Sequence, residues 1–146
     1  SGVYVPLKQE LDEWVNASYT NNPKEPQKLI HKTIPGILVR SKSEALIINA
    51  LFEHKIPFRY ECLLQIQNVS IYPDFTIRHP VTGEVYYWEH FGMMDNEDYY
   101  NAVLRKLDAF EMNQLLIGRD VLLLHESSSA PLNTRVLDCY IQEYLV

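Results

Sequence analysis

The chain has 146 residues, of which 47% are hydrophobic, 12% aromatic and 22% charged, and its formal net charge is −6. This length and composition exclude a disordered chain and predict a single folded unit with a substantial core. No apolar run approaches the roughly 20 residues of a membrane span, and no signal peptide opens the chain, so we expect no membrane partner.

Two lone cysteines, Cys62 and Cys139, lie far apart in the sequence. They indicate buried thiols in a reducing compartment rather than a disulfide scaffold or a zinc site, and we expect a cytoplasmic protein. The chain opens on Ser1-Gly2 without an initiator Met. We therefore expect either an added N-terminal sequence or a piece of a longer protein.

The first half of the chain predicts two helices and a strand. Apolar residues at helical spacing indicate a helix from Pro6 to about Tyr19 and a second from Ser41 to His54, joined through a linker at Asn21 to Pro26. Alternating apolar residues predict a strand from Phe58 to Gln67. The residues expected on one face of this strand are Tyr60, Cys62, Leu64 and Ile66.

A β-hairpin is predicted next, with strands Ile71 to Ile77 and Val85 to Phe91. Pro80 has the fixed φ suited to an early turn position, and Gly83 can adopt a positive φ at its end. A four-residue loop Pro80 to Gly83 pairs His79 with Glu84. This register places Asp74 directly opposite Glu89, whereas a loop of three or five residues would break the alignment.

The last part of the chain predicts helix, strand, helix. Asp95 or Asn96 can cap a long helix to about Asn113, with Gly118 closing it. The inward side of this helix is expected to hold Tyr100, Val103, Leu104, Leu107 and Phe110. A buried strand follows at Asp120 to His125, and Asn133 or Thr134 starts the final helix.

This order, αβββαβα, predicts an α/β fold with a mixed four-stranded sheet flanked by helices. The connection from Val85 to His125 should be a right-handed crossover that makes the last strand parallel to its neighbour. Residues 1–37 would form an N-terminal helix and a basic linker segment, and residues 38–146 the main domain.

The acids Asp74 and Glu89 are the strongest functional signal. Like charges in facing positions repel, so the pair indicates a cation between them, and a divalent metal is the natural candidate. Glu44 lies in the first turn of its helix and points by spacing toward the core. Ser41-Lys42-Ser43-Glu44 also fits a capping box, in which Glu44 bonds the N–H of Ser41, and the two roles can coexist.

A basic segment precedes this helix. Five cations lie between residues 24 and 43 with a single acid, Glu25: Lys24, Lys28, Lys32, Arg40 and Lys42. We expect them to bind nucleic-acid phosphates, although a solvated basic loop gives the same pattern.

Together, Glu44, the Pro73-Asp74 step and Glu89 resemble the PD-(D/E)XK nuclease superfamily, which has the restriction-endonuclease-like fold. The resemblance covers roughly Leu38 to the C-terminus. It implies metal-dependent hydrolysis of phosphodiesters, with Mg²⁺, or Mn²⁺ as a substitute, bound by Asp74, Glu89 and the backbone carbonyl of His90. Glu44 would assist directly or through water.

One departure from the pattern concerns the family lysine, because its position holds Phe91. Lys106 and Lys42 are the candidates for the displaced cation. Lys106 is favoured because it shares a stripe with Val103 and Phe110, although a solvated helix lysine remains the alternative. His90 alternates to the face opposite Glu89 and is either a structural histidine or, like Lys42, a catalytic or substrate-contacting residue.

These observations predict a magnesium-dependent DNA endonuclease or exonuclease with catalytic Glu44, Asp74, Glu89 and Lys106. The alternative is a non-cleaving nuclease-like fold that binds nucleic acid or protein. A metal-independent enzyme is the less favoured third reading. A homodimer and the choice between DNA and RNA stay open.

Overall fold

The structure is a computed structural model that describes residues 4–92 and 96–146. Over these residues the main sheet has the strand order β1-β4-β5-β6. Strands β1 (Phe58–Tyr60), β4 (Phe75–Arg78) and β5 (Val85–Phe91) are antiparallel neighbours, and β6 (Val121–His125) runs parallel to β5. The predicted α/β class, mixed sheet and parallel last strand are confirmed.

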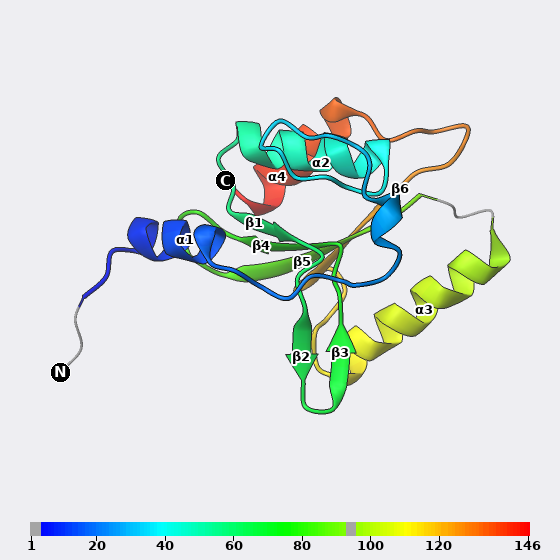
Figure 1. Ribbon diagram of the computed structural model, residues 1–146, viewed down its shortest axis with the longest axis horizontal. Coiled ribbons are helices and arrows are strands. Elements are labelled where there is room, and N and C mark those ends of the chain that lie inside the picture. The colour runs from blue at the N-terminus through cyan, green and yellow to red at the C-terminus, as the bar shows by residue number, and fades with distance from the viewer. Residues whose placement is uncertain (1–3, 93–95) are drawn as a thin grey trace.

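Helices cover both faces of this sheet (Figure 1). Helices α2 (Lys42–Glu53) and α4 (Thr134–Tyr144) lie together over one face, and α3 (Glu97–Met112) lies on the other side. The N-caps of α2, α3 and α4 are Ser41, Asn96 and Asn133, respectively. Each cap side chain accepts a hydrogen bond from a backbone N–H in the first turn of its helix. The alternative cap Asp95 lies outside the described residues.

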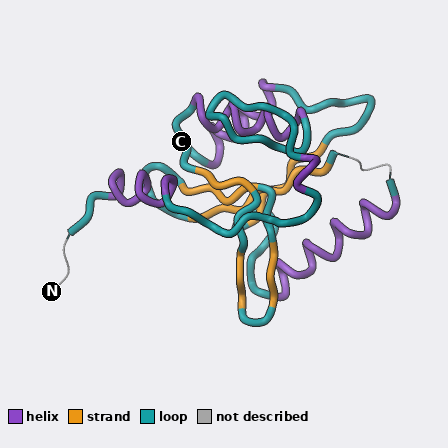
Figure 2. Tube along the Cα trace, viewed as in Figure 1, coloured by secondary structure: helices purple, strands orange, loops and turns teal. Residues whose placement is uncertain are grey.

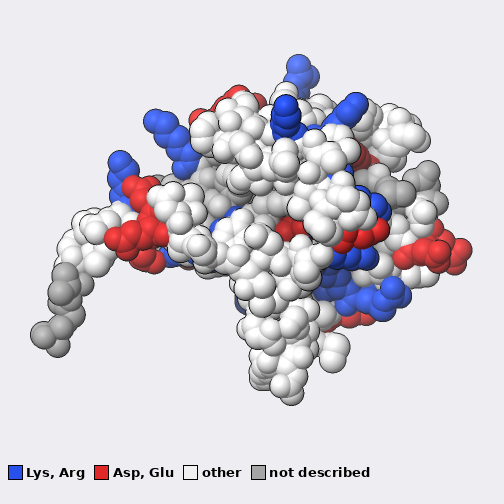
Figure 3. All heavy atoms as spheres, in the orientation of Figure 1, with Lys and Arg blue, Asp and Glu red and all other residues white. Residues whose placement is uncertain are grey.

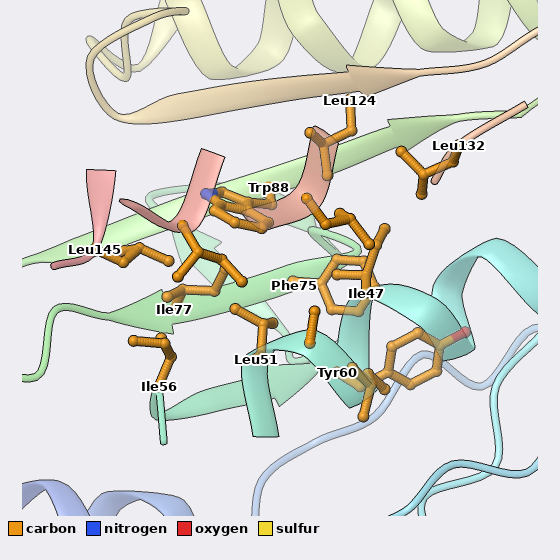
Figure 4. Close-up of a cluster of buried hydrophobic side chains, with 14 of the residues drawn as sticks. Ile47, Leu51, Ile56, Tyr60, Phe75, Ile77, Trp88, Leu124, Leu132 and Leu145 are labelled. Atoms are coloured by element: carbon orange, nitrogen blue, oxygen red, sulfur yellow. The ribbon is translucent and has the colours of Figure 1, made fainter. Parts of the chain in front are cut away.

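The main core lies between the sheet and the α2–α4 pair (Figure 4). The side chains of Phe75, Ile77 and Trp88 are fully buried there. They pack against a group from the two helices that includes Ile47, Leu51, Leu137 and Ile141. A smaller cluster around Phe110 and Val121 holds α3 on the opposite face. Apolar packing on both faces of the sheet therefore holds the strands in place.

The hairpin register is confirmed. Phe75 pairs with Trp88 and Arg78 with Val85, and the N–H of His79 donates to the carbonyl of Glu84 at 2.8 Å. Gly83 has a φ of 76°, the left-handed conformation that the turn requires.

The predicted strand Phe58–Gln67 is wrong, because it divides. Strand β1 ends at Tyr60, and β2 (Leu64–Ile66) pairs with β3 (Val69–Ile71) in a separate hairpin that projects from the body (Figure 1). Glu61 has a φ of 48° and Gln67 a φ of 51°, so the chain turns at both positions. Tyr60 therefore does not share a sheet face with Leu64 and Ile66.

Smaller differences concern helix ends and exposure. Helix α1 (Leu7–Asn16) ends three residues before Tyr19. Gly118 does not close α3 but lies in the turn before β6, with a φ of 89°. Tyr100 and Leu104 are exposed, because α3 packs on the sheet mainly through Val103, Leu107 and Phe110 and its first half projects outward. Both cysteines are free, but only Cys62 is buried and Cys139 is exposed.

The chain between α1 and α2 is mostly loop, with one short 3-10 helix, η1 (Pro26–Lys28) (Figure 2). Helix α1 contacts the sheet domain through the Glu10–Arg78 ion pair at 2.9 Å and through the Trp14 ring, 4.3 Å from the guanidinium of Arg59. The division at residue 37 stays a prediction. Within residues 4–92 and 96–146, no helix has the length and apolar character to cross a bilayer.

Candidate active site

Asp74 and Glu89 lie side by side where β4 begins and β5 nears its end. Asp74 directly precedes Phe75 and Glu89 directly follows Trp88, and Phe75 and Trp88 are paired in the sheet. One oxygen of Asp74, Oδ2, accepts the backbone N–H of His90 at 2.7 Å, which fixes the carboxylate against β5. Glu89 is only 2% exposed. Two carboxylates therefore meet at a buried strand end, as the hairpin predicted.

Lys106 of α3 supplies the cation between them. Its Nζ lies 2.8 Å from Oε2 of Glu89 and 3.6 Å from Oδ1 of Asp74. A cavity of about 180 Å³ opens beside the three side chains, lined also by Tyr99 and Val103. The structure thus brings Lys106 to the acids from the neighbouring helix, while Phe91 is buried in β5.

The electrostatics of this triad follow from burial. Burial and the neighbouring Asp74 raise the pKa of Glu89 well above its usual range, although Lys106 opposes the shift. Burial also opposes the charge on Lys106, but Asp74 and Glu89 outweigh it and raise the pKa of the amine. The amine is therefore charged at neutral pH and offsets part of the repulsion between the acids.

Glu44 approaches the same place from the first turn of α2. Its Oε1 accepts the backbone N–H of Arg40 at 3.1 Å and the hydroxyl of Tyr60 at 3.0 Å. Only half of the predicted capping box forms: Ser41 Oγ accepts the N–H of Glu44, but the Glu44 carboxylate bonds Arg40 rather than the N–H of Ser41. The carboxylate is therefore free of the cap and buried near the acids.

Burial and, next, the charge of Asp74 raise the pKa of Glu44 from 4.5 to about 7. An acid whose folded pKa is raised holds its proton in the folded state after the unfolded chain has lost it. The protonated Glu44 therefore stabilises the folded state fully below pH 4.5, and this stabilisation is lost as the pH rises to about 7. The shift corresponds to at most about 3 kcal/mol.

We expect Glu44→Gln, which cannot lose a proton, to remove this pH dependence. The variant's free energy of unfolding, relative to the parent's, should increase by up to about 3 kcal/mol between pH 4.5 and pH 7.5. Urea unfolding in EDTA measures it, with Glu53→Gln at the exposed end of α2 as control. Parallel pH curves for Glu44→Gln and the parent would contradict the raised pKa.

A larger cavity of about 560 Å³ joins these acids to the basic segment. Its lining includes Glu44, Asp74 and His90 from the acid site and Lys24 and Lys28 from the basic segment. Figure 3 shows basic and acidic side chains next to each other in the region between η1 and α3. The segment predicted to bind phosphates therefore borders the acid site.

The other predicted phosphate contacts are placed differently. Lys32 and Lys42 are exposed and lie outside the residues that line this cavity. Arg40 lines it, but its guanidinium already bonds Glu61 and two backbone carbonyls within the molecule.

His90 points to the opposite side of the sheet from Glu89, as its alternation predicted. Its Nε2 is buried, has no hydrogen-bond partner among residues 4–92 and 96–146, and lies 3.6 Å from Oε1 of Glu126, which accepts a hydrogen bond from the hydroxyl of Ser43. Burial lowers the pKa of His90. Burial opposes the ionisation of Glu126, but hydrogen bonds from Ser43 and the N–H of Leu132 lower its pKa.

Sequence reasoning missed Glu126, Tyr60 and Tyr99. Glu126 directly follows β6, and the ends of parallel neighbouring strands meet at one edge, so its position could have been inferred. The hydroxyl of Tyr99, in the first turn of α3, donates to the carbonyl of His90 at 3.2 Å. Tyr60 carried no such signal, because its bond to Glu44 joins two elements whose packing the sequence does not reveal.

Two carboxylates at the strand end are candidate ligands for a divalent cation. Within the part of the chain that the structure describes, Oε1 of Glu89 is a buried carboxylate oxygen without a hydrogen-bond partner, and Asp74 Oδ1 lies 3.6 Å from Nζ of Lys106. Among the described residues, no group of three or more His, Cys, Asp or Glu side chains is arranged to hold a metal. A cation here would thus bind two carboxylates and need further oxygen ligands, such as the carbonyl of His90, water or substrate.

Comparisons of the chain with known protein families, curated proteins and solved structures found no match.

Proposed function

We propose that the protein is a metal-dependent nuclease that hydrolyses phosphodiester bonds of DNA. The observation that carries this proposal is the position of the Lys106 amine, 2.8 Å from Glu89 and 3.6 Å from Asp74. Two facing carboxylates and one lysine at a strand end are the groups that the resemblance to the PD-(D/E)XK superfamily requires. Here the lysine comes from a helix.

Each side chain has a part in this reaction. Asp74 and Glu89, with the carbonyl of His90, would hold Mg²⁺ or Mn²⁺, which supplies Lewis acidity to the scissile phosphate. Lys106 orients the attacking water and offsets negative charge as it develops. Glu44 contacts water or cation from the 560 Å³ cavity, and Lys24 and Lys28 at its wall bind the flanking phosphates.

A second candidate function is a nuclease-like fold that binds nucleic acid without cleaving it. The same ion pairs favour it, because Lys106 already compensates Asp74 and Glu89 without a metal. The two functions differ in whether a divalent cation binds at this position and whether cleavage follows.

We expect cleavage of DNA in Mg²⁺ or Mn²⁺ and none in EDTA. The test uses supercoiled, linear and single-stranded DNA, with an RNA of the same sequence, and gels that separate nicks from end trimming. Glu44→Gln should lose most of the activity. Glutamine can still accept the hydrogen bonds from the N–H of Arg40 and the hydroxyl of Tyr60, but it carries no negative charge. If neither metal supports cleavage and the protein still binds DNA, the proposal of a nuclease is wrong and the second candidate, a fold that binds nucleic acid without cleaving it, is favoured.

A further inference from the structure

The guanidinium of Arg40 is bonded almost entirely within the molecule. Its Nε lies 2.8 Å from Oε2 and 3.1 Å from Oε1 of Glu61, and the two side chains are only 18% and 8% exposed. Its terminal nitrogens donate to the backbone carbonyls of Lys24 and Glu25. A planar guanidinium suits such forked bonding, which a lysine cannot reproduce.

The same pair is connected to the acid site through the backbone. The N–H of Arg40 donates to Glu44, and the N–H of Glu61 donates to the carbonyl of Asp74 at 3.0 Å. The carbonyl of Glu61 also accepts the N–H of Asn22 at 3.1 Å. One ion pair therefore joins the lysine-bearing loop to both Glu44 and Asp74.

Two residues that bond Arg40 have left-handed backbone conformations. Glu25 has a φ of 46° and Glu61 a φ of 48°. Side chains other than glycine disfavour this region, so surrounding contacts must hold both residues in it. Strained conformations of this kind concentrate at ligand sites. Here they occur at the two ends of the Arg40 contacts, beside the cavity.

The loop that Arg40 holds carries the cations of the cavity wall. Lys24 and Lys28 lie on either side of η1's first residue and both line the 560 Å³ cavity that contains Glu44 and Asp74. Most of this segment is loop (Figure 2), and the backbone bridges that hold the neighbouring chain, Asn21 with Cys62 and His31 with Val39, lie on either side of residues 22–28.

We propose that Arg40 and Glu61 are positioning residues that hold segment 22–28 across the acid cavity, so that Lys24 and Lys28 meet the phosphates on either side of the scissile bond. This inference rests on the proposed function. It assigns the ion pair to substrate binding, so changes in it act on KM and on the salt dependence of binding more than on kcat.

Glu61→Gln gives the sharpest test. The substitution makes the protein less acidic and frees Arg40, so simple electrostatics, or direct contact of Arg40 with phosphate, would tighten DNA binding. A positioning role predicts the opposite: binding at least about tenfold weaker, with the slope of log K against log salt reduced by about two as the two lysine contacts are lost. The matched control is Glu143→Gln, which changes the charge equally on the exposed side of α4.

Binding is measured by fluorescence anisotropy of a labelled DNA duplex and a single strand, in EDTA and in Ca²⁺. In Mg²⁺, KM should rise about tenfold while kcat changes less than about threefold. Arg40→Lys keeps the positive charge but cannot form the guanidinium's several hydrogen bonds, so it should weaken DNA binding as Glu61→Gln does. Arg135→Met, which removes an exposed cation on α4, is the control. Trypsin should also cut after Lys24 and Lys28 faster in Glu61→Gln and Arg40→Lys, with circular dichroism unchanged.

The outcomes separate this inference from the nuclease proposal. DNA binding in EDTA that weakens in Glu61→Gln supports the positioning role even if no metal supports cleavage. Binding that tightens or stays equal in Glu61→Gln and Arg40→Lys overturns it, even in an active nuclease. A parent protein that binds no DNA overturns both.

Discussion

Lys106→Met is expected to reduce DNA cleavage by about 10²–10³-fold. Methionine keeps most of the side chain's length but removes the charge that lies 2.8 Å from Glu89 and 3.6 Å from Asp74. In the proposed nuclease reaction, loss of this charge would leave the attacking water without its orienting group and the developing negative charge without compensation. Single-turnover cleavage at saturating Mg²⁺ measures the effect, and Arg105→Met, the exposed neighbour on α3, is the control.

A second measurement on the same variant does not depend on activity. Removing Lys106 leaves two neighbouring carboxylates without their cation, so the melting temperature in EDTA should fall. Mg²⁺ should then raise the melting temperature more in Lys106→Met than in the parent, because the metal no longer competes with the amine. Lys42→Met, at the exposed start of α2, should have the smaller effect on cleavage. The reverse ranking would move the catalytic role to Lys42.

Asp74→Asn is expected to abolish cleavage. Asparagine can still accept the N–H of His90 that Asp74 accepts at 2.7 Å, so the local geometry should remain. The metal, however, loses one of its two carboxylates, and the Mg²⁺-dependent rise in melting temperature should disappear. In EDTA the variant should be as stable as the parent or more stable, because Asp74 contributes to raising the pKa of Glu89 by repulsion.

Gel assays and thermal melts with and without Mg²⁺ check these expectations, with Asp108→Asn on the exposed side of α3 as control. If Asp74→Asn cleaves as fast as the parent, Asp74 is not part of the active site. A melting temperature well below that of the parent in EDTA would instead make Asp74 chiefly a partner of Lys106.

The local features of the fold were predictable because short-range chemistry determines them. The turn from Pro80 to Gly83 fixed the β4–β5 register, and through it the meeting of Asp74 with Glu89. The spacing of Lys106 with Val103 and Phe110 placed its side chain on the face of α3 that meets the sheet. The residues of one turn were sufficient to predict the first contact, and the periodicity of one helix was sufficient to predict the second.

Features that depend on contacts between distant segments were not predictable in this way. The break of β1 at Glu61 depends on the left-handed backbone there and on the ion pair to Arg40, 21 residues earlier. The same holds for Glu126, which reaches Ser43 across 83 residues of sequence. The charge of Arg40 predicts a phosphate contact, but the sequence does not reveal that Glu61 is the buried partner of its guanidinium.

The supply of the lysine from α3 has a consequence for the geometry of the site. The side chain of a residue on β5 points to one face of the sheet because side chains alternate along a strand. The side chain of Lys106 points to the sheet only because of its position around the axis of α3. One residue inserted between Lys106 and Leu107 would turn the amine by about 100° relative to Leu107 and Phe110, which hold α3 on the sheet, although Asp74 and Glu89 would remain. The contact of Lys106 with Glu89 therefore depends on the winding of α3, which the strand residues alone do not reveal.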